Sequence, residues 1–138
     1  MKSPIRSAKP FDSILHAREI MEKHRINQLP VLVDGKLVGI VTDRDLRDAF
    51  PSAFAGKRKQ EAFDAQQITV ESVMTTNVLT AAPRDDVIAV ARLMRQERIG
   101  AVPIVDSGRV VGILTRSDLL DALVGLELQL AERRGKST

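Results

Sequence analysis

Two threonine–aspartate pairs are the strongest candidates for a binding function in this chain. Thr42 precedes Asp45 by three residues at the end of the apolar run LVGIVT, and Thr115 precedes Asp118 in the same way after VVGILT. A carboxylate accepts hydrogen bonds from both hydroxyls of a ribose, and a helix N-terminus offers free N–H groups to a phosphate. The same spacing also makes a capping box, in which Thr and Asp satisfy backbone N–H groups of a new helix. The residues alone leave both interpretations open.

The two pairs belong to an internal duplication. An offset of 73 residues relates Thr42 to Thr115 and Pro30 to Pro103, and 40 ungapped positions contain 15 identities. A sequence that repeats at a fixed offset indicates that the same structural unit occurs twice. We therefore divide the sequence into repeat 1 (1–50), a linker (51–67), repeat 2 (68–126), and a helix end with a basic tail (127–138).

Each repeat predicts the element order β-α-β-β-α. In the second copy Val78–Thr80 suits a short strand, and Asp85 or Asp86 opens a helix with apolar residues on one face. Two β-branched strands follow, with a turn at Asp-Ser-Gly there and at Asp34-Gly35 in the first copy. A second helix starts after Thr115. We expect an α+β fold of two repeats packed as one pseudo-twofold module, because neither repeat buries its sheet alone.

The linker and the last helix predict further contacts. Three of the four Phe residues fall at Phe50, Phe54 and Phe63, so we expect the linker to pack onto the body. The last helix carries two apolar stripes, and a helix of that kind faces two partners. Their residues are Leu119, Ala122, Leu123, Leu126 and Leu130 in one, and Leu120, Val124, Leu128 and Ala131 in the other.

Composition argues against several functional classes. The chain has 138 residues, 43% of them hydrophobic, no Cys and a net charge of +3, which is typical of a globular protein. We expect a cytoplasmic protein without disulfides, metal sites or membrane contacts, since His16 and His24 lack metal-ligand neighbours and no signal peptide is recognisable. Nucleic-acid binding is not favoured, because the basic runs lack aromatic partners. No catalytic motif is found, so we do not expect an enzyme.

The chain resembles the CBS domain, which occurs in pairs called Bateman modules. The resemblance rests on the duplicated unit, the Pro in the first hairpin strand, and the run of Gly, two apolar residues, Thr, two residues and Asp; it extends from Met1 to about Leu126. A weaker likeness, carried by DRDLRDA and the following Pro-Ser, is to the paired CBS part of acetoin-utilisation-type proteins. The resemblance implies a regulatory module that binds AMP, ADP, ATP or an adenosyl compound in clefts between the repeats, with no cofactor required.

The same resemblance implies the ligand-contacting residues. Thr42 and Thr115 would reach phosphate, Asp45 and Asp118 would bind ribose, and Arg44 and Arg116 either neutralise phosphate or lie exposed. Backbone positions would add further contacts in both copies; these are Thr80, Ala82, Gly100, Ala101, Val102 and Pro103 in the second, and Ser7, Lys9, Asn27, Gln28 and Leu29 in the first. Because Asn27 and Gln28 replace Gly100 and Ala101, we expect the cleft of Asp45 to be narrower and less readily occupied.

Two functional hypotheses remain. In the first, the module senses a nucleotide and transmits the signal to a regulated protein that the sequence does not identify. In the second, it is a structural dimerisation module without a bound ligand. Both include a homodimer through the stripe of Leu120, Val124 and Leu128, which the family's habit of pairing modules implies.

Overall fold

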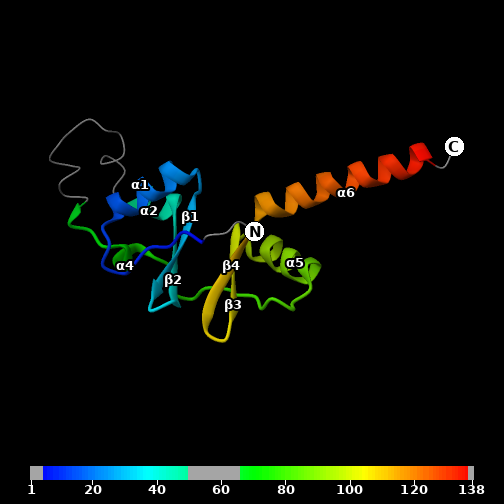
Figure 1. Cartoon of the computed structure of the whole chain (residues 1–138). Coiled ribbons are helices and arrows are strands. Elements are labelled where there is room, and N and C mark those ends of the chain that lie inside the picture. The colour runs from blue at the N-terminus through cyan, green and yellow to red at the C-terminus, as the bar shows by residue number, and fades with distance from the viewer. Residues whose placement is uncertain (1–4, 50–65, 137–138) are drawn as a thin grey trace.

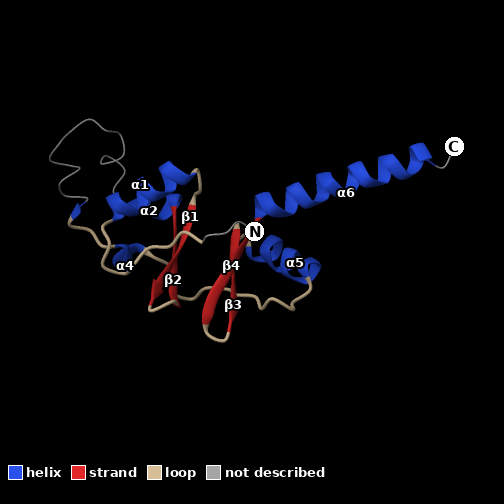
Figure 2. Ribbon diagram, viewed as in Figure 1, coloured by secondary structure: helices blue, strands red, loops and turns tan. Residues whose placement is uncertain are grey.

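The computed structural model describes residues 5–49 and 66–136, which form an α+β fold (Figures 1 and 2). In chain order the elements are α1 (Ile14–His24), β1 (Gln28–Val33), β2 (Lys36–Thr42), α2 (Asp43–Ala49), α4 (Val70–Val73), α5 (Val87–Glu97), β3 (Ala101–Asp106), β4 (Arg109–Thr115) and α6 (Arg116–Lys136). The strands form one antiparallel sheet in the order β1-β2-β4-β3. The repeats meet in that sheet at Lys36 and Arg109, and Arg109 Nη1 also donates to Asp34 O at 3.1 Å.

The duplication seen in the sequence is reproduced in the backbone. The first helix, both hairpin strands and the second helix of repeat 2 each begin 73 residues after their counterparts in repeat 1. Ser13 and Asp86 are the N-caps of α1 and α5, and both helices end at an Arg in the left-handed conformation, with φ of 54° at Arg25 and 55° at Arg98. The pseudo-twofold arrangement and the helix start at Asp86 are therefore confirmed.

The hairpin turns follow the predicted positions. Asp34 and Gly35 have φ of 52° and 81°, and Ser107 and Gly108 have φ of 54° and 80°. Two consecutive residues with positive φ form the type I′ turn, whose twist matches that of the flanking strands. Each hairpin thus places Thr42 or Thr115 at the end of its second strand.

The predicted strand at Val78–Thr80 is wrong. Ala81, the next residue, makes one parallel bridge with Ile104, and Ala81 N donates to Pro103 O at 3.0 Å. Pairing stops there because the Asp85 carboxylate accepts from Ala82 N at 2.8 Å and turns the backbone toward α5. Ala8 makes the corresponding bridge with Val31 in repeat 1.

The apolar core forms two clusters, and the side chains of the second cluster are less fully buried than those of the first. The first surrounds β1 and β2 and contains fully buried side chains that include Ile14, Leu29 and Leu46. The second surrounds β3, β4 and α5, where Val102 is fully buried while Leu114 and Leu119 are partly exposed. Figure 1 shows α1, α2 and α4 gathered around the first hairpin and α5 beside the second.

The segment after the linker packs on repeat 1. Val70 is fully buried in the first cluster, Val70 N donates to Asp12 O at 2.7 Å, and Thr75 pairs with Ile40 in both directions. The short helix α4 was not expected from sequence. Residues 68–75 therefore complete the core of repeat 1, although the sequence division assigns them to repeat 2. Phe50, Phe54 and Phe63 lie outside the described residues, and the expectation that they pack down stays a prediction.

Candidate ligand-binding clefts

Both Thr-x-x-Asp motifs form complete capping boxes at strand-to-helix junctions. Thr42 N donates to Asp45 Oδ2 at 2.9 Å, and Asp45 N donates to Thr42 Oγ1 at 3.1 Å. Thr115 N donates to Asp118 Oδ2 at 3.0 Å, and Asp118 N donates to Thr115 Oγ1 at 3.1 Å. The capping interpretation is confirmed in both copies. Within each box the carboxylate accepts through Oδ2 only, so capping by itself does not exclude contact with a ligand.

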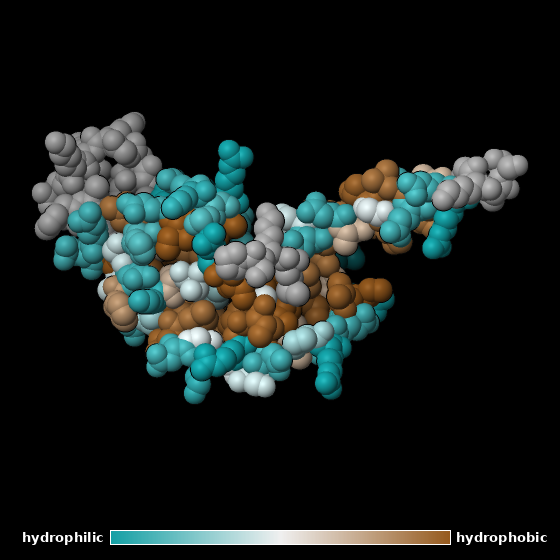
Figure 3. Space-filling model, viewed as in Figure 1, coloured by the Kyte–Doolittle hydropathy of each residue, from teal (hydrophilic) through white to brown (hydrophobic). Residues whose placement is uncertain are grey.

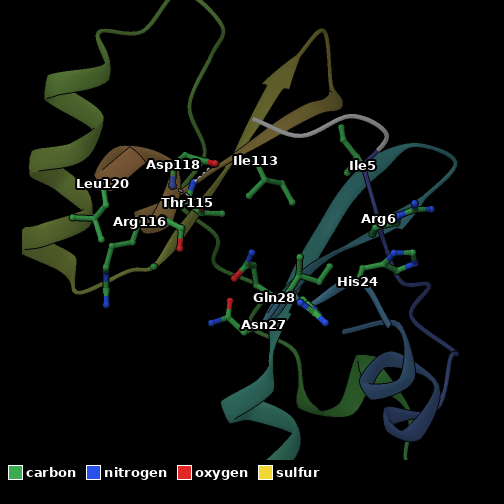
Figure 4. Close-up of a pocket in the computed structure, with 14 residues that line it drawn as sticks. Ile5, Arg6, His24, Asn27, Gln28, Ile113, Thr115, Arg116, Asp118 and Leu120 are labelled. Atoms are coloured by element: carbon green, nitrogen blue, oxygen red, sulfur yellow. Dashed lines mark hydrogen bonds between the residues drawn. The ribbon is translucent and has the colours of Figure 1, made fainter. Parts of the chain in front are cut away.

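The larger cleft, cleft A, lies beside the second motif and has a volume of about 800 Å³. Repeat 2 contributes Thr115, Arg116 and Asp118, while repeat 1 contributes residues around Arg6 and the start of β1. In Figure 4 the Thr-x-x-Asp residues lie on one side of the cavity, Arg6 and His24 on the other, and Asn27 and Gln28 between them. The full lining is Ile5, Arg6, His24, Arg25, Ile26, Asn27, Gln28, Gly100, Ile113, Thr115, Arg116, Ser117, Asp118 and Leu120.

The smaller cleft, cleft B, lies beside the first motif and has a volume of about 380 Å³. Here repeat 1 contributes the end of β2 and the start of α2, and the segment from Asn77 to Leu79 and the start of β3 come from the other repeat. The full lining is Asn27, Gln28, Ile40, Thr42, Asp43, Arg44, Arg47, Thr75, Asn77, Val78, Leu79, Arg98, Ile99, Gly100 and Ala101. Asp45 does not line this cleft.

Each cleft is thus built crosswise, from the Thr-x-x-Asp of one repeat and the first segment of the other. Cleft B is smaller, in line with the expectation that the cleft beside the first motif is narrower, but Asn27 and Gln28 line both cleft A with Asp118 and cleft B with Thr42. Gly100 also lines both clefts. The physical reason is that the residues before β1 and β3 lie at the junction of the repeats, where the two clefts share a wall.

Backbone hydrogen bonds fix this shared wall. Asn27 O accepts from Asp43 N at 2.8 Å, and Gly100 O accepts from Arg116 N at 2.9 Å. The residue before each first hairpin strand therefore holds the first residue of the second helix in its own repeat. This links the position of the helix starts to the shape of both clefts.

The structure brings together about half of the residues expected from the resemblance. Cleft A contains Asn27, Gln28, Gly100, Thr115, Arg116 and Asp118, and cleft B contains Asn27, Gln28, Thr42, Arg44, Gly100 and Ala101. The remaining expected residues line neither cleft: Ser7, Lys9, Leu29, Asp45, Thr80, Ala82, Val102 and Pro103. Leu29, Val102 and Pro103 are fully buried, so a contact from them would come from backbone atoms. Their ligand roles stay predictions.

Sequence reasoning missed several lining residues that the 73-residue offset relates in pairs. Ile5 and Val78, Ile26 and Ile99, and Ile40 and Ile113 occupy equivalent positions of opposite clefts. Their apolar side chains suit the faces of a flat aromatic ring. The offset was the signal that could have found them, once each motif is combined with the other repeat.

Each cleft is lined by three arginines and one aspartate, so the two clefts differ in how these charges are paired and not in their number; the residues are Arg6, Arg25, Arg116 and Asp118 in cleft A, and Arg44, Arg47, Arg98 and Asp43 in cleft B. Within the described residues the ion pairs involve Arg18, Arg44 and Arg47 on the basic side, and none involves Arg6 or Arg116 of cleft A. In cleft B, Arg47 lies 3.1 Å from Asp43, which reduces the positive charge offered there.

His24 adds a titratable group to the wall of cleft A. Desolvation, followed by the positive charges of Arg6 and Lys23, lowers the pKa of its imidazole below the ordinary value. His24 is therefore largely neutral near pH 7. A negative charge brought into the cleft would raise the pKa of His24 again.

Comparisons with known proteins agree with a tandem pair of repeats. The family model described as CBS domain matches residues 1–52 and 70–125. A CBS domain-containing protein of Dictyostelium discoideum is 39% identical over 111 residues, covering 78% of this chain and 77% of the relative. No helix among the described residues is long and apolar enough to cross a membrane.

Two solved structures share the fold over nearly their whole length. An acetoin utilization protein of Vibrio cholerae superposes with a TM-score of 0.78 at 29% identity, covering 96% of this chain and 92% of that one. The CBS domain pair of the protein MJ0100, in complex with 5′-methylthioadenosine and S-adenosyl-L-methionine, superposes with a TM-score of 0.73 at 37% identity, covering 91% and 92%.

Proposed function

The chain belongs to the CBS-domain family as a tandem pair of repeats, and we propose that it is a regulatory module that binds an adenine nucleotide in cleft A and transmits this to a protein partner. The observation that carries the proposal is the crosswise cleft, in which Asp118 and Thr115 of one repeat lie opposite Arg6 and Gln28 of the other. A volume of about 800 Å³ lies within the usual range for small-molecule sites, about 300–1,000 Å³.

The residues of cleft A divide into ribose, phosphate and base contacts. Asp118 binds the ribose hydroxyls through its carboxylate, as acidic residues do in dinucleotide folds. Arg116 N and Asp118 N already donate to Gly100 O and Thr115 Oγ1, so phosphate is bound by the Thr115 hydroxyl, Ser117 N and the guanidinium of Arg116, at a helix N-terminus that carries partial positive charge. The apolar side chains of Ile26 and Ile113 flank the base.

The charge of cleft A favours phosphorylated ligands over S-adenosyl-L-methionine. Arg6, Arg25 and Arg116 line it together with the single acidic residue Asp118. The sulfonium and ammonium groups of S-adenosyl-L-methionine are cationic and would face this positive wall, whereas AMP, ADP and ATP bring one or more phosphates to it. The MJ0100 pair binds adenosyl compounds, so the adenosyl part of the ligand is the shared feature and the phosphate is the feature proposed for this chain.

Cleft B is proposed as a secondary site. It is smaller than cleft A, Arg47 is already paired with Asp43, and Asp45 does not line it. A ligand in cleft B would find no carboxylate of Asp45 to bind its ribose unless the start of α2 moved. Occupancy of cleft B should therefore require higher nucleotide concentrations.

The module is proposed to act as a homodimer through Leu120, Val124 and Leu128 of α6. These side chains are 57%, 57% and 63% exposed, and such a contiguous apolar surface marks an interaction site. The same exposure, together with the capping boxes that are complete without a ligand, supports the alternative of a structural dimerisation module. In neither case does the chain itself carry out catalysis.

Ligand-dependent thermal unfolding distinguishes a sensor from a structural module. A ligand present at 100 times its dissociation constant stabilises the folded state by about 2.7 kcal/mol, which raises Tm by several degrees in a domain of this size. We expect AMP, ADP or ATP to give such a shift, and adenosine and S-adenosyl-L-methionine a smaller one. Absence of any shift up to millimolar nucleotide would leave the dimerisation module as the function.

A further inference from the structure

Both repeats carry an arginine at a position where the backbone favours glycine. Arg25 and Arg98 end α1 and α5, and both have left-handed backbone angles, with φ of 54° and 55° and ψ of 46°. Glycine is the usual residue at such a helix end, because a Cβ in this conformation lies too close to the following carbonyl oxygen. The duplication therefore retains the same unfavourable residue in both copies.

The helix ends do not need the arginine side chains for their own geometry. Ile26 N donates to Met21 O at 3.0 Å, and Ile99 N donates to Met94 O at 2.8 Å. Ile26 packs against the first core cluster and Ile99 against the second. In this Schellman motif the left-handed residue contributes only its backbone, so glycine would form it with less strain.

The charges within the protein do not account for the two arginines either. A cation near a helix C-terminus interacts favourably with the last carbonyl groups, but Lys23 already supplies one in the last turn of α1 and Arg95 in that of α5. Arg25 and Arg98 are exposed, and none of the ion pairs among the described residues involves them. Their guanidinium groups are therefore available to a ligand.

Both side chains line a ligand cleft, and they do so crosswise. Arg25 of repeat 1 lines cleft A together with Thr115 of repeat 2, and Arg98 of repeat 2 lines cleft B together with Thr42 of repeat 1. Figure 3 shows hydrophilic side chains around the turn from α1 to β1, the turn that contains Arg25. Each arginine thus belongs to the repeat that does not supply the phosphate-binding threonine of its cleft.

We infer that Arg25 and Arg98 are specificity residues that bind the outer phosphates of a nucleoside di- or triphosphate, Arg25 in cleft A and Arg98 in cleft B. In cleft A the repeat 2 wall binds the phosphate next to the ribose, and a longer phosphate chain extends from there to Arg25 on the repeat 1 wall. A planar guanidinium suits this contact, because it donates two parallel hydrogen bonds to phosphate oxygens. The inference rests on the proposed function and adds to it a preference for ATP over AMP.

Replacement of Arg25 by glycine separates binding from folding. Arg25→Gly removes the backbone strain, so the ligand-free Tm should equal or exceed that of the wild type. Isothermal titration should show ATP binding weakened about fivefold, the size of an exposed charge pair's effect, and AMP binding nearly unaltered. An unchanged ratio of ATP to AMP affinity overturns the inference. A marked fall in the ligand-free Tm would overturn the argument from strain, because it would show that Arg25 stabilises the helix end.

The matched control is Ser107→Gly. Ser107 also has a left-handed backbone, with φ of 54°, but it lies in the second hairpin turn and lines neither cleft. Its replacement relieves the same kind of strain and should leave both nucleotide affinities unchanged. If Ser107→Gly lowers the ATP-to-AMP ratio as much as Arg25→Gly does, the effect comes from backbone flexibility and the role of Arg25 is refuted.

A double variant tests the share of Arg98. Arg98→Gly added to Arg25→Gly should reduce the Tm shift at millimolar ATP further, because cleft B then loses its arginine as well; no further reduction refutes the role of Arg98. A wild type that binds neither ATP nor AMP refutes the proposed function and this inference with it. A wild type that binds both, with a ratio that Arg25→Gly leaves unchanged, refutes the inference alone.

Discussion

Asp118 and Gln28 come from different repeats and line the same cleft. Their meeting follows from the junction of the two hairpins, where the start of β1 lies opposite the end of β4. A ligand that fills cleft A would contact both repeats at once, so the proposed binding would act on the interface between the repeats. Signalling requires that the ligand bind one arrangement of the two repeats more tightly than another. A ligand that touches both repeats meets this requirement whenever the repeats can shift relative to each other.

The crosswise cleft predicts that a residue of repeat 1 contributes to phosphate binding. Arg6 faces the phosphate site from the opposite wall of cleft A (Figure 4), so Arg6→Gln should weaken AMP binding by up to about fivefold through the loss of an attractive charge. Adenosine, which lacks the phosphate, should bind both proteins equally. Isothermal titration of the two ligands measures this.

The matched control for Arg6 is Arg84→Gln. Arg84 is exposed and lines neither cleft, so its loss should leave both affinities unchanged. Equal weakening by the two variants would mean that only general charge matters and that Arg6 makes no specific contact.

The lowered pKa of His24 predicts opposite pH effects on stability and on binding. The unfolded chain protonates His24 near its ordinary pKa of about 6.5, whereas the folded protein resists protonation. Without ligand, unfolding is therefore favoured as pH falls through that range. With an anionic ligand, the protonated imidazole gains an attraction, so the His24 contribution to AMP affinity rises as pH falls from 8 to 6.

Comparison with His24→Gln isolates this effect. The affinity ratio of wild type to variant should increase toward pH 6 by no more than about fivefold, the size of an exposed ion pair's effect. The ratio cancels the titration of the AMP phosphate itself. A ratio that stays constant from pH 8 to pH 6 would remove His24 from the phosphate environment.

Gly39 predicts a stability effect that depends on the segment after the linker. A Cβ at Gly39 would lie 2.9 Å from Thr75 O and 2.6 Å from Met74 Sδ. Gly39→Ala should therefore push residues 68–75 off repeat 1 and cost about 1–3 kcal/mol, lowering Tm by several degrees. Gly125→Ala is the control, because nothing lies within 4 Å there and alanine favours helix. Equal Tm values for the two variants would contradict the close packing of Thr75 on β2.

Several features could be predicted from the sequence because local signals determined them. The capping boxes at Thr42 and Thr115, the Gly-containing turns and the helix start at Asp86 each depend on neighbouring residues. The 73-residue offset then placed the starts of α5, β3, β4 and α6. These signals are short-range and act in the same way in both copies.

Other features depended on contacts between distant segments. Nothing local in residues 68–75 indicates that Val70 fills the core of repeat 1. The combination of Asn27 and Gln28 with Asp118 likewise arises from packing between repeats, which the alignment of one repeat on the other does not reveal. The predicted strand at Val78–Thr80 failed because parallel pairing with β3 is confined to the single bridge of Ala81 and Ile104, beyond which Asp85 turns the backbone toward α5.

The central claim, that the Thr-x-x-Asp of repeat 2 is a ribose site as well as a cap, is tested most directly by the AMP-induced change in Tm of Asp118→Asn. The amide oxygen of Asn can still accept the hydrogen bond from Thr115 N, so the ligand-free Tm should remain nearly unaltered. Most of the AMP shift should be lost, and Asp45→Asn should lose less because cleft B is smaller and is not lined by Asp45. An Asp118→Asn protein that keeps the full AMP shift would contradict the account and leave the Thr-x-x-Asp pair as a helix cap alone.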